Sequence, residues 1–159
     1  MKKNGFTMVE LLVAISLFLV VVSIATGTFI QALRTQRAAV SLIAATSNAS
    51  LAIEQMAREI RTGQNFSLSG GELSFLNAKS ENIIYRLQNE AIEKSVNGSA
   101  GRITADNVQV NRLDFAVAGI EPGDDLPSKI TLVLGISAPQ ASPGNQVNLQ
   151  TTISSRILE

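Results

Sequence analysis

Residues 1–30 read MKKNGFTMVELLVAISLFLVVVSIATGTFI and contain a long apolar run. From Leu11 to Ile30 it carries no charged residue. A helix of that length rises about 1.5 Å per residue and reaches about 30 Å, the thickness of the hydrocarbon core of a bilayer. Helices of soluble proteins are rarely apolar on all sides. The stretch therefore predicts a membrane-spanning helix.

The charges that flank the apolar run indicate its orientation. Lys2 and Lys3 place the N-terminus in the cytoplasm by the positive-inside rule, whereas Arg34 and Arg37 at the other end weaken this bias. A secretory signal peptide is the alternative, but its apolar core has only about 7–15 residues before the cleavage site. Because the run here is longer, we expect a single-pass anchor in the cytoplasmic (inner) membrane, with the C-terminal domain outside the cytoplasm.

Composition limits the classes of function. The 159 residues are enough for one domain and a membrane segment, and 13 basic residues balance 13 acidic ones. No overall charge therefore attracts nucleic acid. The chain has no cysteine and no histidine, so disulfides, thiolate metal sites and the commonest general base are excluded. Carboxylate pairs such as Glu90 with Glu93 and Asp124 with Asp125 remain, but solvated charge is the better interpretation, and we expect no enzyme.

Glu10 is the one carboxylate beside the apolar run. A charge inside the hydrocarbon costs a few kcal/mol, so it persists only with a partner or a function. Two interpretations are open from the residues alone. Glu10 can lie hydrated at the level of the lipid headgroups, or it can have a functional partner.

The stretch KKNGFTMVELLVAISLFLVV, residues 2–21, resembles the prepilin signature of type IV pilins and type II secretion pseudopilins. In that family a short basic leader ends in glycine, and phenylalanine, threonine, an apolar pair and glutamate follow. The matching positions here are Gly5, Phe6, Thr7, Met8, Val9 and Glu10. The resemblance covers about the first 30 residues.

The resemblance implies a processing step and an assembly role. A prepilin peptidase would cut between Gly5 and Phe6, remove the leader of residues 1–5, and methylate the new amino group to give N-methylphenylalanine. A glycine before the cut lets the backbone enter a narrow cleft. In the family the glutamate meets the amino terminus of a neighbouring subunit, so Glu10 is the expected assembly residue. Such a charge pair in low dielectric offsets part of its desolvation.

Gly27 departs from the family pattern, because many major pilins carry a proline inside the apolar helix. This chain has no proline before Pro122. Glycine costs a helix about 1 kcal/mol relative to alanine. Gly27 is therefore expected to be a mild flex point or a close-packing site between membrane helices.

The helix is expected to continue past the membrane. Residues 6–30 would form its membrane half and filament core, and residues 31–63 an amphipathic half. Arg58 and Arg61 suit the negative end of this helix, and Gly63 suits the position after it. The predicted buried face comprises Ala49, Ile53, Met56 and Ile60, extended backwards by Val40 and Ile43.

After Gly63 the apolar period changes to two, which predicts strands. FSLSGGELSFL indicates a hairpin about Gly70 and Gly71. The further strands expected are NIIYRLQ, AIEKSV, NVQVNRLDFAVAG, KITLVLGIS and QVNLQTTISSRIL. The predicted fold is α+β and pilin-like, with the long N-terminal helix packed on an antiparallel β-sheet formed by residues 64–159.

The strand region resembles one subgroup of the family. LSFLNAKSENIIYRLQNEAIEKSV, residues 73–96, is similar to a stretch of J-type minor pseudopilins and related minor pilins. LQTTISSRIL, residues 149–158, resembles the last strand of the same group. The resemblance favours a minor subunit.

One loop of the sequence is a candidate calcium site. GIEPGDDLPS, residues 119–128, places Glu121, Asp124 and Asp125 in a glycine- and proline-rich loop. Their oxygens suit calcium, and some pseudopilins bind calcium near the C-terminus, but the spacing is not that of an EF-hand. Acidic turn residues are usually solvated, so the main expectation is no cofactor.

The sequence thus predicts a non-catalytic subunit of a type IV pilus or a type II secretion pseudopilus. Its partners would be other pilins or pseudopilins, the prepilin peptidase and methyltransferase, and the inner-membrane assembly platform, with no nucleic acid. Two alternatives are a pilin for DNA uptake or adhesion, and a plain membrane-anchored domain outside the cytoplasm.

Overall fold

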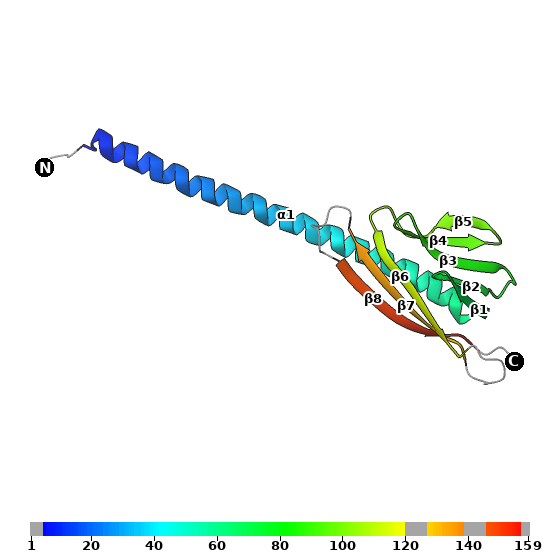
Figure 1. The fold of residues 1–159 in the computed structure, drawn as a ribbon. Helices are drawn as coiled ribbons and strands as arrows, with labels where there is room; N and C mark the ends of the chain where they lie inside the picture. Colours follow the sequence, from blue (N-terminus) through cyan, green and yellow to red (C-terminus); the bar gives the residue numbers. More distant parts are fainter. Residues whose placement is uncertain (1–4, 120–126, 139–145, 157–159) are drawn as a thin grey trace. The chain divides into compact units, whose positions relative to one another are not determined.

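The computed structural model describes residues 5–119, 127–138 and 146–156 (Figure 1). The chain divides into two compact units, residues 1–37 and residues 38–159. One helix, α1 (Met8–Arg61), contributes to both units. The first unit holds the N-terminal part of α1, and the second holds its C-terminal part and the strands.

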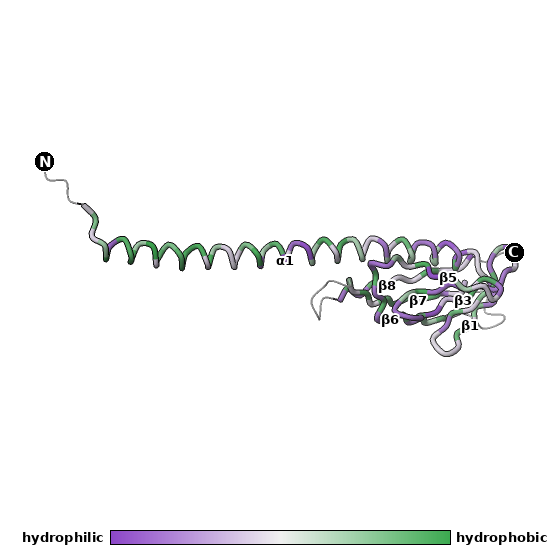
Figure 2. Tube along the Cα trace, turned by 90° about the horizontal axis from the view of Figure 1, so that it is seen from above, coloured by the Kyte–Doolittle hydropathy of each residue, from purple (hydrophilic) through white to green (hydrophobic). Residues whose placement is uncertain are grey.

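In the first unit, every described residue is exposed, and the tube is coloured hydrophobic along most of its length (Figure 2). Four of its hydroxyl side chains are shielded from an apolar solvent, because each donates a hydrogen bond to the carbonyl four residues earlier. These side chains are Ser16, Ser23, Thr28 and Thr35, with distances of 2.7–3.1 Å. Gly27 lies in the unbroken helix, and a Cβ built on it would meet nothing within 4 Å. The stretch is long and apolar enough to cross a bilayer.

The second unit is α+β, as predicted, and its strands form two antiparallel sheets. The first sheet follows chain order, with strands β1 (Gln64–Ser69), β2 (Glu72–Leu76), β3 (Asn82–Gln88), β4 (Ala91–Val96) and β5 (Ser99–Arg102). The second has the order β6 (Gln109–Ala118), β7 (Lys129–Ser137) and β8 (Gln146–Ser154). Both sheets contribute to one core with α1.

Short turns set the register of the first sheet. Gly70–Gly71 connects β1 to β2, Asn89–Glu90 connects β3 to β4, and Asn97–Gly98 connects β4 to β5. All six residues have positive φ, between 50° and 91°, which is typical of two-residue hairpin turns of type I′. The predicted hairpin at Gly70–Gly71 is confirmed. Strand β5 was not among the predicted strands, because its sequence SAGR has little β-propensity.

The buried face of α1 differs in part from the prediction. Its fully buried positions are Ala45, Ala49, Ala52, Met56 and Ile60. Ile53 is partly buried at the margin of this face. Val40 and Ile43 were predicted to extend the face backwards, and this is wrong, because they are 61% and 69% exposed. Three of the five buried positions are alanines instead.

Aromatic packing explains Gly63 better than helix capping does. A Cβ on Gly63 would lie 2.6 Å from the Phe75 ring and 3.0 Å from the Phe66 ring. These two rings pack with their centroids 5.3 Å apart. The φ of Gly63 is not in the left-handed region, so the capping role that the sequence suggested is not what requires glycine here.

We expect Gly63→Ala to lower the free energy of unfolding by about 1–3 kcal/mol, since the added methyl group must displace a packed ring. Chemical denaturation of the full chain in detergent measures this. Gly101→Ala is the matched control, because a Cβ at Gly101 in β5 meets nothing within 4 Å. Equal stability of the two variants would contradict the packing explanation.

A polar network joins α1 to the first sheet inside this core. The Tyr85 hydroxyl donates a hydrogen bond of 2.8 Å to Glu59, and the Lys94 ammonium donates one of 2.5 Å to the other carboxylate oxygen. Tyr85 is fully buried, and the side chains of Lys94 and Glu59 are only 17% and 26% exposed. Burial raises the pKa of Tyr85 far above its usual range, and the hydrogen bond and charge of Glu59 raise it further.

Alkaline pH should therefore destabilise the fold through Tyr85. The unfolded phenol ionises near pH 10, whereas the folded phenol stays neutral at that pH. The stabilisation is complete below about pH 10 and is lost as the pH rises above it. Tyr85 is the only tyrosine and there is no tryptophan, so ultraviolet absorbance of tyrosinate follows this one group.

We expect tyrosinate absorbance to rise only as the chain unfolds, and Tyr85→Phe to weaken the alkaline loss of stability. Circular dichroism on the same samples reports the folded fraction. A tyrosinate titration centred near pH 10 in a chain that stays folded would contradict the network.

Candidate functional site

Helix α1 begins with reciprocal hydrogen bonds between Thr7 and Glu10. The Glu10 backbone N–H donates to the Thr7 hydroxyl at 3.2 Å, and the Thr7 backbone N–H lies 3.4 Å from a Glu10 carboxylate oxygen. The Leu11 N–H donates to the Thr7 carbonyl at 3.2 Å, so Thr7 is the residue that caps the helix. This arrangement is a capping box, and it satisfies backbone donors that the helix itself leaves unpaired.

The Glu10 carboxylate lies beside an apolar hollow on the helix surface. The hollow has a volume of about 440 Å³ and is lined by Phe6, Glu10, Leu11, Ala14, Ile15 and Phe18. Phe6 and Phe18 are 85% and 66% exposed. The carboxylate therefore stands next to apolar surface that has no cover from the described residues, where a neighbouring cation would interact strongly with it.

The predicted processing site lies just before this cap. Gly5 and Phe6 precede the first residue of α1, and both are exposed. A peptidase that binds extended backbone needs a segment outside a helix, and this segment meets that requirement. The capping role of Thr7 was not predicted, although the pattern T-x-x-E before an apolar run is the signal for a capping box.

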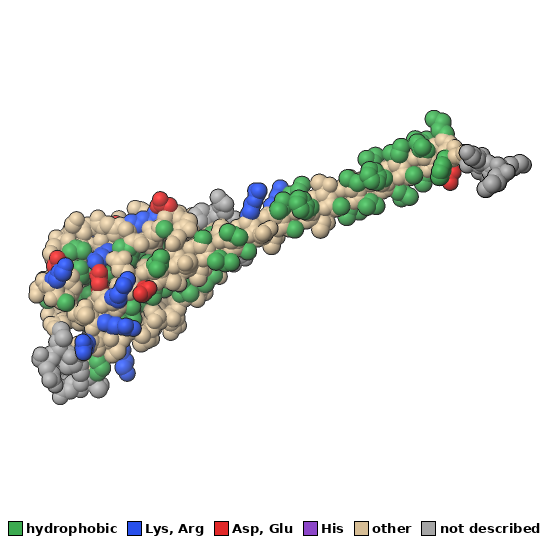
Figure 3. Space-filling model, turned by 180° about the vertical axis from the view of Figure 1, so that it is seen from behind, with side chains coloured by type: hydrophobic (Ala, Val, Ile, Leu, Met, Phe, Trp, Pro, Cys, Tyr) green, Lys and Arg blue, Asp and Glu red, His purple; other side chains and the backbone are tan. Residues whose placement is uncertain are grey.

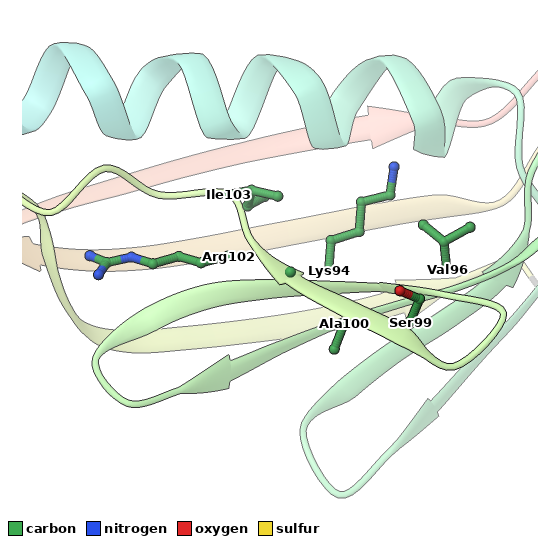
Figure 4. A pocket seen from close by; sticks show the side chains of 7 residues that line it. Lys94, Val96, Ser99, Ala100, Arg102 and Ile103 are labelled. Atoms are coloured by element: carbon green, nitrogen blue, oxygen red, sulfur yellow. The ribbon is translucent and has the colours of Figure 1, made fainter.

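The second unit contains a separate hollow under the edge of the first sheet (Figure 4). Its volume is about 290 Å³, and its lining residues are Lys94, Val96, Ser99, Ala100, Gly101, Arg102 and Ile103. Both cations already have anionic partners. Lys94 points toward α1 and pairs with Glu59, and Arg102 pairs with Asp106 at 2.9 Å. Among the described residues that line the hollow, both cations are therefore paired.

The calcium candidates Glu121, Asp124 and Asp125 lie outside the described residues. Within the described ranges, no group of three or more acidic side chains could hold a metal ion. Calcium binding by this loop stays a prediction.

Comparison with known proteins agrees with the N-terminal geometry. Residues 1–26 match the family model of the prokaryotic N-terminal methylation motif. This range contains Gly5, Phe6, Thr7 and Glu10. No curated protein and no solved structure is significantly similar to the chain. The chain therefore carries a prokaryotic N-terminal methylation motif at residues 1–26, and this match supports a prepilin-type protein.

Proposed function

We propose that this protein is a non-catalytic subunit, a minor pilin or pseudopilin, of a type IV pilus or a type II secretion pseudopilus. A prepilin peptidase removes residues 1–5 and methylates Phe6. The anchored subunit is then transferred from the inner membrane into a filament by the assembly platform. Its apolar helix packs against those of other subunits, and the β-rich unit is extracytoplasmic.

The observation that carries this proposal is the methylation motif on an apolar, exposed and capped helix. The motif covers residues 1–26, and α1 is exposed from its start through Arg37. Such a surface is unstable in water and needs lipid or other apolar helices around it. A precursor in the membrane and a subunit in a helix-packed filament both provide that cover.

The capping box gives Glu10 a role in the precursor as well as in the filament. Within one chain the carboxylate accepts from the Thr7 N–H and stabilises the helix N-terminus. After cleavage, the amino group of Phe6 is a cation beside the same carboxylate. We propose that Glu10 holds the cap in the membrane and pairs with the Phe6 amino group of a neighbouring subunit in the filament.

Processing is tested by the intact mass of the protein from membranes that contain a prepilin peptidase. We expect a mass without Met1–Gly5 and with one added methyl group. Gly5→Leu should leave the chain uncut, because a side chain before the scissile bond blocks the narrow cleft. Gly27→Ala is the control, since it changes a distant glycine with free space around it and should be cut normally. An uncut wild-type chain would indicate a plain membrane anchor.

The two roles of Glu10 are separated by a pair of variants. Glu10→Gln keeps an oxygen that can complete the cap but removes the charge, whereas Glu10→Ala removes both. We expect both variants to be cleaved and both to enter filaments poorly, measured by co-purification with filament subunits. Thr7→Val removes the hydroxyl that accepts from the Glu10 N–H but keeps the charge of Glu10. We therefore expect Thr7→Val to enter filaments better than Glu10→Gln or Glu10→Ala does. Normal assembly of Glu10→Gln would contradict the charge pair and leave only the cap.

A further inference from the structure

The apolar surface of α1 ends at two arginines on one side of the helix. Arg34 and Arg37 are three residues apart, and both are exposed. They are the first charged residues after Glu10. Figure 3 shows Lys and Arg side chains standing out from the helix beyond its long stretch of apolar side chains.

No carboxylate of α1 is placed to pair with these arginines. Partners on a helix lie three or four residues away, and Arg34 and Arg37 have only uncharged residues and each other at those positions. Glu54 is the next acidic residue along the helix after Glu10. Neither arginine forms an ion pair within the described ranges. Two like charges at this spacing repel, so an anion from outside the chain would stabilise them.

Their position along the helix matches the headgroup level of a bilayer. Arg34 is 24 residues after Glu10, which corresponds to about 36 Å of helix. This length exceeds the hydrocarbon core of about 30 Å and falls within the full thickness of about 40–45 Å. Long basic side chains at such a position extend toward the headgroups.

The residues that follow Arg37 are uncharged, and they explain why the depth of α1 in the membrane needs a charged contact at this position. Residues 38–45 read AAVSLIAA and contain no charge. Without Arg34 and Arg37 the uncharged stretch would continue from Leu11 to Ala44, just before the buried face of α1 begins at Ala45, and would be longer than a bilayer core. Hydrophobicity alone would then not fix which part of α1 spans the membrane, and the helix could move along its own axis.

We propose that Arg34 and Arg37 form a binding site for the phosphate groups of lipids at the extracytoplasmic face, and that this contact fixes the depth of α1. A guanidinium group binds phosphate through two parallel hydrogen bonds, which an ammonium group cannot do. This proposal rests on the membrane anchoring included in the proposed function. It adds a ligand and a site that filament assembly does not require.

The test measures the depth of one labelled residue in vesicles. The chain has no cysteine, so Ala39→Cys gives a single site for a spin label just beyond the arginines. The full chain is reconstituted in phosphatidylethanolamine and phosphatidylglycerol vesicles, and the depth follows from collision with oxygen and with a water-soluble nickel chelate. We expect R34Q/R37Q to move the label toward the hydrocarbon by about 5 Å, one turn of the helix.

Three comparisons identify the ligand as phosphate. R34K/R37K keeps both charges and should shift the label less than R34Q/R37Q does. R58Q/R61Q removes two arginines near the other end of α1 and should leave the depth unchanged. In vesicles of a neutral galactolipid without phosphate, the wild-type chain should take the depth of R34Q/R37Q.

An unchanged depth in R34Q/R37Q would overturn the proposal, and so would equal wild-type depths in phospholipid and galactolipid. Resistance to alkaline carbonate extraction reports insertion separately. A wild-type chain that fails to insert would overturn both this proposal and the membrane anchoring. An inserted chain with unchanged depth would overturn the arginine site alone.

Discussion

The exposed apolar surface of α1 is the constraint on which the other features depend. From Met8 to Arg37 every side chain of the helix is exposed, while four of its hydroxyl groups donate to carbonyls of the helix itself. In water this surface is unfavourable, so the protein needs a solvent of lipid or of other helices. Glu10 and Arg34 lie at the two ends of this surface. Because they are charged, they indicate where the apolar surroundings end and water begins.

The second unit differs from the first, because its apolar side chains are buried within the chain's own core. Alanines on one side of α1 share one core with residues of both sheets, and the ring of Phe75 packs between Phe66 and Tyr85. The network of Glu59, Tyr85 and Lys94 places polar groups between α1 and the first sheet. A buried network of that kind costs desolvation, and the two hydrogen bonds to Glu59 offset part of this cost.

The sequence predicts the parts of this structure that depend on local pattern. Uncharged length identifies α1, and β7 spans the predicted stretch KITLVLGIS, because β-branched residues are frequent there. The burial of Ala45 and the exposure of Ile43 were not predictable, because hydrophobicity ranks isoleucine above alanine and only the packing geometry reverses the order. The contact of Glu59 with Lys94 joins residues far apart in sequence and has no local signal. The Thr7 cap does have one, in the pattern TMVE.

The connectivity of the sheets has a kinetic consequence. Within each sheet, every strand pairs with the next strand along the chain. Strand pairing within a sheet therefore joins only segments that are neighbours in sequence. Closing short loops costs little entropy, and topologies with mainly local contacts form faster than those with long-range pairing. A chain whose first helix is held in a membrane while the rest emerges from it can thus complete its strands one hairpin at a time, with few unpaired edges exposed to other emerging copies.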